Sequence, residues 1–258
     1  MSRLWTFCAI VKRYLIELKR YPFNTLSGLA TLYIVFLLIF LGARYVQSAG
    51  VSLFGESLEG LVVGYMMWTF ALAAFSDLSW ALMREAQLGT LEQLYMCPYG
   101  FRFVSLAWIA GSFLTGLIFV GVLLGLMMLT TGHLLHLPLG SLLPLLLLTV
   151  AAVYGVGFAM AGLALVFKRI QSFFQILQFV FVALVALPAE PWWAKALPLS
   201  LGTRLIARVM IEGRSLGELP GSDLLILVAN GLVYLGLGLA AFTFCERAAR
   251  RRGLLAHY

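Results

Sequence analysis

The stretch "SLLPLLLLTVAAVYGVGFAMAGLALVF", Ser141 to Phe167, contains no charged residue. A helix rises about 1.5 Å per residue, so about 20 apolar residues cross the roughly 30 Å of hydrocarbon in a bilayer. The composition of the chain agrees with a membrane protein, because 62% of its residues are hydrophobic and 11% are charged. Soluble domains carry about 45–50% apolar and about 25% charged residues. The sequence therefore predicts an all-α integral membrane protein.

Further apolar stretches lie on both sides of this one, and together they predict six transmembrane helices in a single transmembrane domain, 1–258. The predicted spans cover 27–47, 60–80, 103–131, 141–167, 171–189 and 222–245. Three other segments are expected to be helical: an N-terminal interfacial helix at 1–22, a short helix at 83–95 between the second and third spans, and an outer re-entrant segment at 190–221.

The basic residues are divided unequally between the two sides of this topology. Thirteen of the eighteen lie on the side of the termini: Arg3, Lys12, Arg13, Lys19, Arg20, Arg84, Arg102, Lys168, Arg169, Arg247, Arg250, Arg251 and Arg252. Basic residues in short loops stay cytoplasmic, so both termini and the 81–102 segment are expected in the cytoplasm. The net charge of +7 is thus explained by topology and by contact with membrane lipid, and it does not require nucleic-acid binding.

The terminal and outer segments are amphipathic. Apolar residues recur at helical spacing in the first segment, at Leu4, Cys8, Val11, Leu15 and Leu18, and Pro22 ends it. This pattern predicts a helix that lies in the inner interface. The outer segment is divided by three prolines around "LGTRLIARVMIEG", which predicts a helix that dips partway into the outer leaflet.

The residues that would support catalysis by this chain are missing. The three cysteines, Cys8, Cys97 and Cys245, match no metal-ligand spacing and are expected to be free thiols. His133 and His136 lie in a short outer turn without an acidic neighbour in sequence, which argues against a metal site. No lysine follows a glycine, so no phosphate-binding loop is present. The chain is therefore expected to be no enzyme by itself, with no catalytic residue and no bound cofactor.

Two polar faces occur within the predicted spans. Gln171, Gln175 and Gln178 share one face of the fifth span, and their amides must meet another helix or a hydrated cavity, because an unpaired amide in hydrocarbon costs several kcal/mol. In the second span, Tyr65, Trp68 and Thr69 belong to a comparable mixed face. Both faces are candidates for a substrate path, and helix packing is the alternative for each.

Glycines recur in the third span at Gly111, Gly116, Gly121 and Gly125. The last two form a small-xxx-small step, which permits close approach of another helix and supports a packed bundle.

The segment "ALMREAQLGTLEQLYMCPYGF", Ala81 to Phe101, interrupts the apolar sequence with charged residues. By itself it could be a solvated loop helix. Its pattern is Arg84 and Glu85, then Gly89, Thr90, Leu91, Glu92 and Leu94, then Pro98. In this position between the second and third spans, it resembles the coupling segment in the membrane subunits of ABC exporters of the type-2 family. The order of elements along most of the chain is similar as well, although "ALPLS", with Leu197 before Pro198, stands where the family often has Asn-Pro.

This resemblance implies a permease subunit in a bacterial cytoplasmic membrane. Two permease subunits, identical or different, would form the membrane path as a dimer, and separate ABC ATPase subunits would bind ATP and Mg. The residues from Arg84 to Leu94 would dock the ATPase, and the complex would move a hydrophobic, amphipathic or glycan-linked substrate outward.

Two alternatives come from other classes. One is a non-transporting membrane scaffold or sensor that binds a cytoplasmic partner through residues 85–94. The other is a membrane-embedded lipid enzyme, which the missing catalytic groups disfavour.

Overall fold

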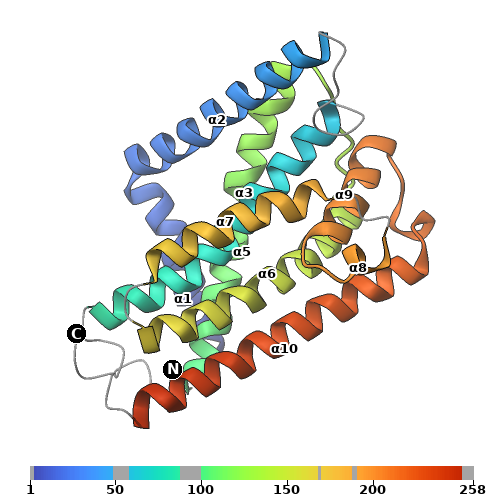
Figure 1. The fold of residues 1–258 in the computed structure, drawn as a ribbon. Helices are drawn as coiled ribbons and strands as arrows, with labels where there is room; N and C mark the ends of the chain where they lie inside the picture. The colour runs from blue at the N-terminus through green and yellow to red at the C-terminus, as the bar shows by residue number, and fades with distance from the viewer. Residues whose placement is uncertain (1–2, 49–57, 88–99, 168–169, 188–190, 252–258) are drawn as a thin grey trace.

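A computed structural model describes residues 3–48, 58–87, 100–167, 170–187 and 191–251. Within these ranges every element of regular structure is a helix. The elements are α1 (Arg3–Arg20), α2 (Pro22–Ser48), α3 (Leu58–Gln87), α5 (Gly100–Thr131), α6 (Leu139–Phe167), α7 (Gln171–Ala186), α8 (Trp192–Lys195), α9 (Ser200–Glu212), the 3₁₀ helix η1 (Leu216–Glu218) and α10 (Gly221–Arg251). Figure 1 shows their arrangement as a bundle of long helices.

Five of the described helices are long and apolar enough to cross a membrane. Their apolar segments are Pro22–Tyr45, Leu58–Asp77, Phe103–Thr131, Leu139–Phe167 and Gly221–Ala249. The all-α membrane class and its multi-pass character therefore agree with the structure. The remaining predicted span, 171–189, corresponds to α7, which has only 16 residues and a length of about 24 Å.

The early end of α7 has a local cause. Leu187 precedes Pro188, and a residue before proline is pushed toward extended backbone angles. Leu187 has φ −67° and ψ 129°, and its N–H still donates to the carbonyl of Ala183. The helix thus stops at Ala186, before the predicted boundary at residue 189.

The helix α6 is the centre of the bundle. It packs against α3 on one side and α10 on another, and α3 in turn contacts α5, α7 and α9. In an 18-residue apolar stretch of α6, 61% of the residues are buried inside the bundle. The corresponding share is 11% for α2 and 17% for α10. Figure 1 accordingly shows α2 and α10 at opposite edges of the bundle, with α6 between them.

The contact between α6 and α10 depends on glycines. A Cβ at Gly155 would overlap the backbone carbonyl of Tyr234, and a Cβ at Gly238 would overlap the carbonyl of Gly155. In a membrane, where lipid tails are as apolar as leucine, close backbone approach is a main source of helix association. These two glycines therefore set the distance between the central helix and α10.

The buried side chains form two hydrophobic clusters. The main cluster extends over α2, α3, α5, α6, α7, α9 and α10. A smaller one, here called the terminal cluster, consists of Val104, Trp108, Phe158, Ala161, Leu165, Phe242 and Ala249. Ile10 and Tyr14 of α1 and Ala81 of α3 pack against the terminal cluster. Consequently α1 and the last turns of α10 lie at the same end of the bundle, as Figure 1 shows.

The segment between α7 and α10 forms a compact cap at the opposite end. Leu205, Ile206 and Val209 bury one face of α9 in the main cluster. Leu199, just before α9, has a φ of 72°, which is unusual for a residue with a side chain. The described helices α8, α9 and η1 fall within the predicted outer segment, 190–221.

Candidate functional site

The predicted ATPase-coupling residues lie around the end of α3. This helix continues past the end of its apolar segment at Asp77 as far as Gln87, and Arg84 and Glu85 are in this extension. The other predicted coupling residues, Gly89, Thr90, Leu91, Glu92 and Leu94, lie outside the described residues, as do the side chains of Arg84 and Glu85. The structure therefore shows which helices flank the coupling segment, and the contacts of the segment itself stay a prediction.

The two helices that flank the coupling segment pack along each other. Phe70 of α3 and Phe113 of α5 have ring centroids 5.5 Å apart, and a Cβ at Gly116 would meet the ring of Phe70. Nearer to the coupling segment, the Ser112 hydroxyl of α5 donates a hydrogen bond to the Asp77 carboxylate of α3. A displacement of the segment between α3 and α5 would therefore act on two helices that are already joined.

The predicted substrate-path residues of α3 are used mainly in packing. The Tyr65 hydroxyl donates to the backbone carbonyl of Leu32 in α2 over 2.6 Å, and the Thr69 hydroxyl donates to the Met66 carbonyl of its own helix. The indole N–H of Trp68 is buried and has no hydrogen-bond acceptor among the described residues. Trp68 is thus the member of this group that keeps a free donor.

The glutamine face lies on α7. Gln175 is exposed and Gln178 is half-buried, whereas the side chain of Gln171 lies outside the described residues. Phe174 and Phe181 anchor α7 by ring contacts to Phe75 of α3, with centroids 5.2 Å and 5.1 Å apart. The glutamines therefore border this aromatic contact, and the two predicted polar faces lie on a pair of packed helices.

A polar network that the sequence analysis did not identify joins α3, α5 and α6. The Ser112 hydroxyl lies 2.5 Å from Oδ2 of Asp77. The Tyr154 hydroxyl of α6 lies 3.3 Å from the Ser112 oxygen and 3.4 Å from the carbonyl of Ile109. A single carboxylate in an apolar span was the only sequence signal, because one serine and one tyrosine on distant spans form no motif.

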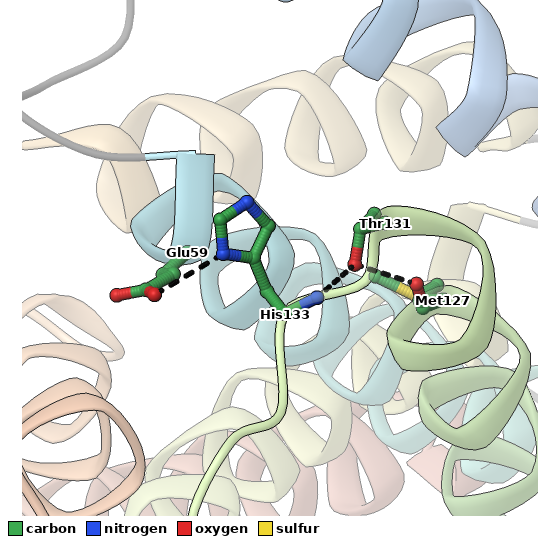
Figure 2. A network of polar contacts seen from close by, with 4 residues as sticks. All are labelled: Glu59, Met127, Thr131 and His133. Carbon is green, nitrogen blue, oxygen red and sulfur yellow. Dashed lines mark hydrogen bonds and ion pairs between the residues drawn. The ribbon is translucent and has the colours of Figure 1, made fainter.

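Polar contacts at the other end of the bundle fix the turn between α5 and α6. Figure 2 shows the imidazole of His133 facing the Glu59 carboxylate at the start of α3, with Nδ1 and Oε1 3.3 Å apart. The Thr131 hydroxyl accepts from the His133 backbone N–H and donates to the Met127 carbonyl. The described parts of the chain contain no group of three metal-ligating side chains. His133 therefore has an acidic partner that is distant in sequence, and this contact joins the turn after α5 to the start of α3.

The cysteines described in the structure are free thiols. Cys8 is exposed on α1, and Cys245 is partly buried on α10. Cys97 lies outside the described residues.

Comparison with known proteins adds no family assignment. No protein-family model matches the sequence, and a search of curated proteins finds no match. The fold and the site define a class on their own: a multi-pass α-helical membrane protein in which two packed helices, α3 and α5, flank a short charged segment.

Proposed function

We propose that the protein is the permease subunit of an ATP-driven ABC exporter of the type-2 family. Two such subunits would form the membrane path, and separate ATPase subunits would supply the energy. The substrate class is hydrophobic, amphipathic or glycan-linked, because the described apolar segments carry few charged residues, and Phe103–Thr131 and Leu139–Phe167 carry none. The membrane would be a bacterial cytoplasmic membrane, with both termini in the cytoplasm.

The observation that carries the proposal is the position of the charged segment. Its residues, from Glu85 through Gly89 to Glu92, resemble a coupling helix, and they begin within the extension of α3 beyond its apolar part. A rigid helix that enters the cytoplasm and is packed against a second helix can transmit a movement into the membrane domain. The long extension of α3 and its packing on α5 support this role.

The sixth crossing of the membrane would be completed by α7 together with the outer segment. α1 and the last turns of α10 pack on the same terminal cluster, which supports an even number of passes along the bundle between them. The five long helices account for an odd number. Val185 of α7 faces Gly64, and Phe174 faces Trp80, so α7 runs antiparallel to α3 over most of its length.

A purification tests the assignment. The protein, carrying an affinity tag and extracted in mild detergent from its native membrane, is expected to retain an ATPase subunit with a phosphate-binding loop. Mass spectrometry would identify this ATPase and any small molecule that accompanies it. Recovery of the protein with a cytoplasmic partner that lacks such a loop would instead favour the membrane scaffold.

The double substitution Glu85→Ala and Glu92→Ala tests the coupling role. It is expected to abolish the substrate stimulation of ATPase activity in the reconstituted complex while the subunit stays in the membrane, because both carboxylates would contact basic or backbone donors of the ATPase. The substitution Glu218→Ala, at an exposed capping box in η1, is a control that removes a carboxylate at the other end of the bundle. Unchanged stimulation in the double variant would contradict the coupling role.

A further inference from the structure

We infer that Asp77, Ser112 and Tyr154 form an interhelical latch that positions the coupling segment by fixing the ends of α3 and α5. The inference concerns a positioning element, and its functional part rests on the proposed function. Its structural part, which is the joining of the three helices, is independent of that function.

The latch is built from hydroxyl groups around one carboxylate. The Ser112 hydroxyl donates to Asp77 over 2.5 Å, at the short end of the range for O–H···O bonds. The Tyr154 hydroxyl is within 3.4 Å of both the Ser112 oxygen and the Ile109 carbonyl. Ser112 and Tyr154 are 4% and 3% exposed. Since buried polar groups are costly without partners, each member of the network depends on the others.

The latch lies at the boundary between the two hydrophobic clusters. On α3, Phe75 belongs to the main cluster and Ala81 packs on the terminal cluster, with Asp77 between them. On α5, Trp108 belongs to the terminal cluster and Val120 to the main cluster, with Ser112 between them. Apolar contacts are non-directional and tolerate sliding, whereas hydrogen bonds have a preferred geometry. The polar layer therefore fixes the register of the helices at the level where the packing changes.

The position of the latch explains what it would control. The Asp77–Ser112 bond joins α3 to α5, and these two helices form a hairpin on either side of residues 88–99. Tyr154 connects this hairpin to α6, the central helix of the bundle. A force on the coupling segment would thus reach the bundle through one defined junction, and weakening of that junction would let the hairpin move alone.

Hydrogen exchange measures the latch without any assumption about function. In the detergent-solubilised protein, Ser112→Ala is expected to increase amide exchange about fivefold in peptides that cover 78–87 and 100–106. The reason is that the loss of one buried hydrogen bond lowers the free energy needed for local opening of the helices. Asp77→Asn keeps an oxygen that accepts from Ser112, so its exchange is expected to stay within about twofold of the wild type.

The control is Thr115→Val, one turn further along α5. The Thr115 hydroxyl donates only to carbonyls of its own helix among its described contacts, those of Gly111 and Ser112. This variant should leave exchange at 78–87 unchanged. Equal exchange in Ser112→Ala and the wild type would overturn the latch. An increase in Asp77→Asn as large as that in Ser112→Ala would overturn it too, since charge and not the hydrogen bond would then hold the helices.

The positioning role is tested in the complex with the ATPase that copurifies. Ser112→Ala is expected to lower substrate-stimulated ATPase activity at least about threefold at unchanged ATPase binding, and Asp77→Asn should retain it. If the exchange increases but stimulation is unaffected, the helices are joined and the positioning role is wrong. If the wild type binds no ATPase, the proposed function fails, while the exchange result still decides the latch.

Discussion

Single residues decide how closely the helices of this protein pack. Gly155 and Gly238 place the backbones of α6 and α10 in direct contact, and Gly162 does the same further along, where a Cβ would lie 2.9 Å from the Cα of Phe242. Close approach of this kind brings Cα–H groups and carbonyl oxygens of neighbouring helices together, which adds weak hydrogen bonds to dispersion. At these three glycines, therefore, the addition of a single methyl group would disturb the packing of α6 on α10.

The substitution Gly155→Ala is expected to destabilise the folded protein by about 1–3 kcal/mol, because the new Cβ forces α6 and α10 apart. Its matched control is Gly236→Ala on α10, where nothing lies within 4 Å of the added Cβ. Thermal unfolding in detergent would measure the difference. Equal melting temperatures for the two variants would show that α10 does not depend on this contact.

The sequence indicates small residues in the spans but does not show which of them meet a neighbour. The step formed by Gly121 and Gly125 permits close approach, and nothing among the described residues lies within 4 Å of a Cβ at either position. Gly111 and Gly116 meet Tyr14 and Phe70 instead. Periodicity gives the face of a helix, whereas the partner depends on tertiary packing. The network of Asp77 escaped sequence analysis for the same reason.

At the scale of elements, the cap between α7 and α10 is held by a few directed contacts. The Lys195 ammonium lies 2.7 Å from the Asp223 carboxylate at the start of α10. The Asn230 amide donates to the Lys195 carbonyl, and the Tyr234 hydroxyl donates to the carbonyl of Ala196. The short helix α8 is too small to be stable alone, so these contacts with α10 determine its position.

Asp223→Ala is expected to cost about 1–3 kcal/mol and to release α8. Asp223 is 5% exposed, and its removal leaves the ammonium of the part-buried Lys195 without its carboxylate. Amide exchange in peptides covering 191–199 should rise in this variant. Glu212→Ala is the control, because its ion pair with Arg214 is about half exposed and such pairs contribute little. If both variants exchange alike, the Asp223 pair does not hold α8.

Elements were easier to predict from the sequence than their ends. Long apolar runs identify the five described helices that are long and apolar enough to cross a membrane, because length and hydrophobicity are local properties. The end of α7 depends on a local effect that apolar periodicity does not contain, because Pro188 pushes Leu187 toward extended backbone angles. The acidic partner of His133 could not be predicted, since Glu59 is far away in the sequence.

At the scale of the whole molecule, burial is distributed unevenly. In 18-residue apolar stretches of α2 and α10, only 11% and 17% of the residues are buried. Both helices expose leucines, such as Leu38 and Leu237. Lipid tails can cover such surfaces at no cost, so their exposure does not by itself indicate a second subunit. The exposed amide of Gln175 is different, because hydrocarbon offers it no hydrogen-bond partner.

Gln175→Leu separates a role in the path from a role in assembly. If the glutamine face of α7 lines a hydrated path, the variant is expected to lower substrate-stimulated ATPase activity of the complex about tenfold and to leave its subunit stoichiometry intact. Native mass spectrometry of the same sample reports that stoichiometry. Thr243→Val is the control, because its hydroxyl donates to the Leu239 carbonyl within α10 and is already satisfied. Loss of stoichiometry in parallel with activity would mean that the amide pairs with another helix, since an interhelical amide in a membrane stabilises association by about 1–2 kcal/mol.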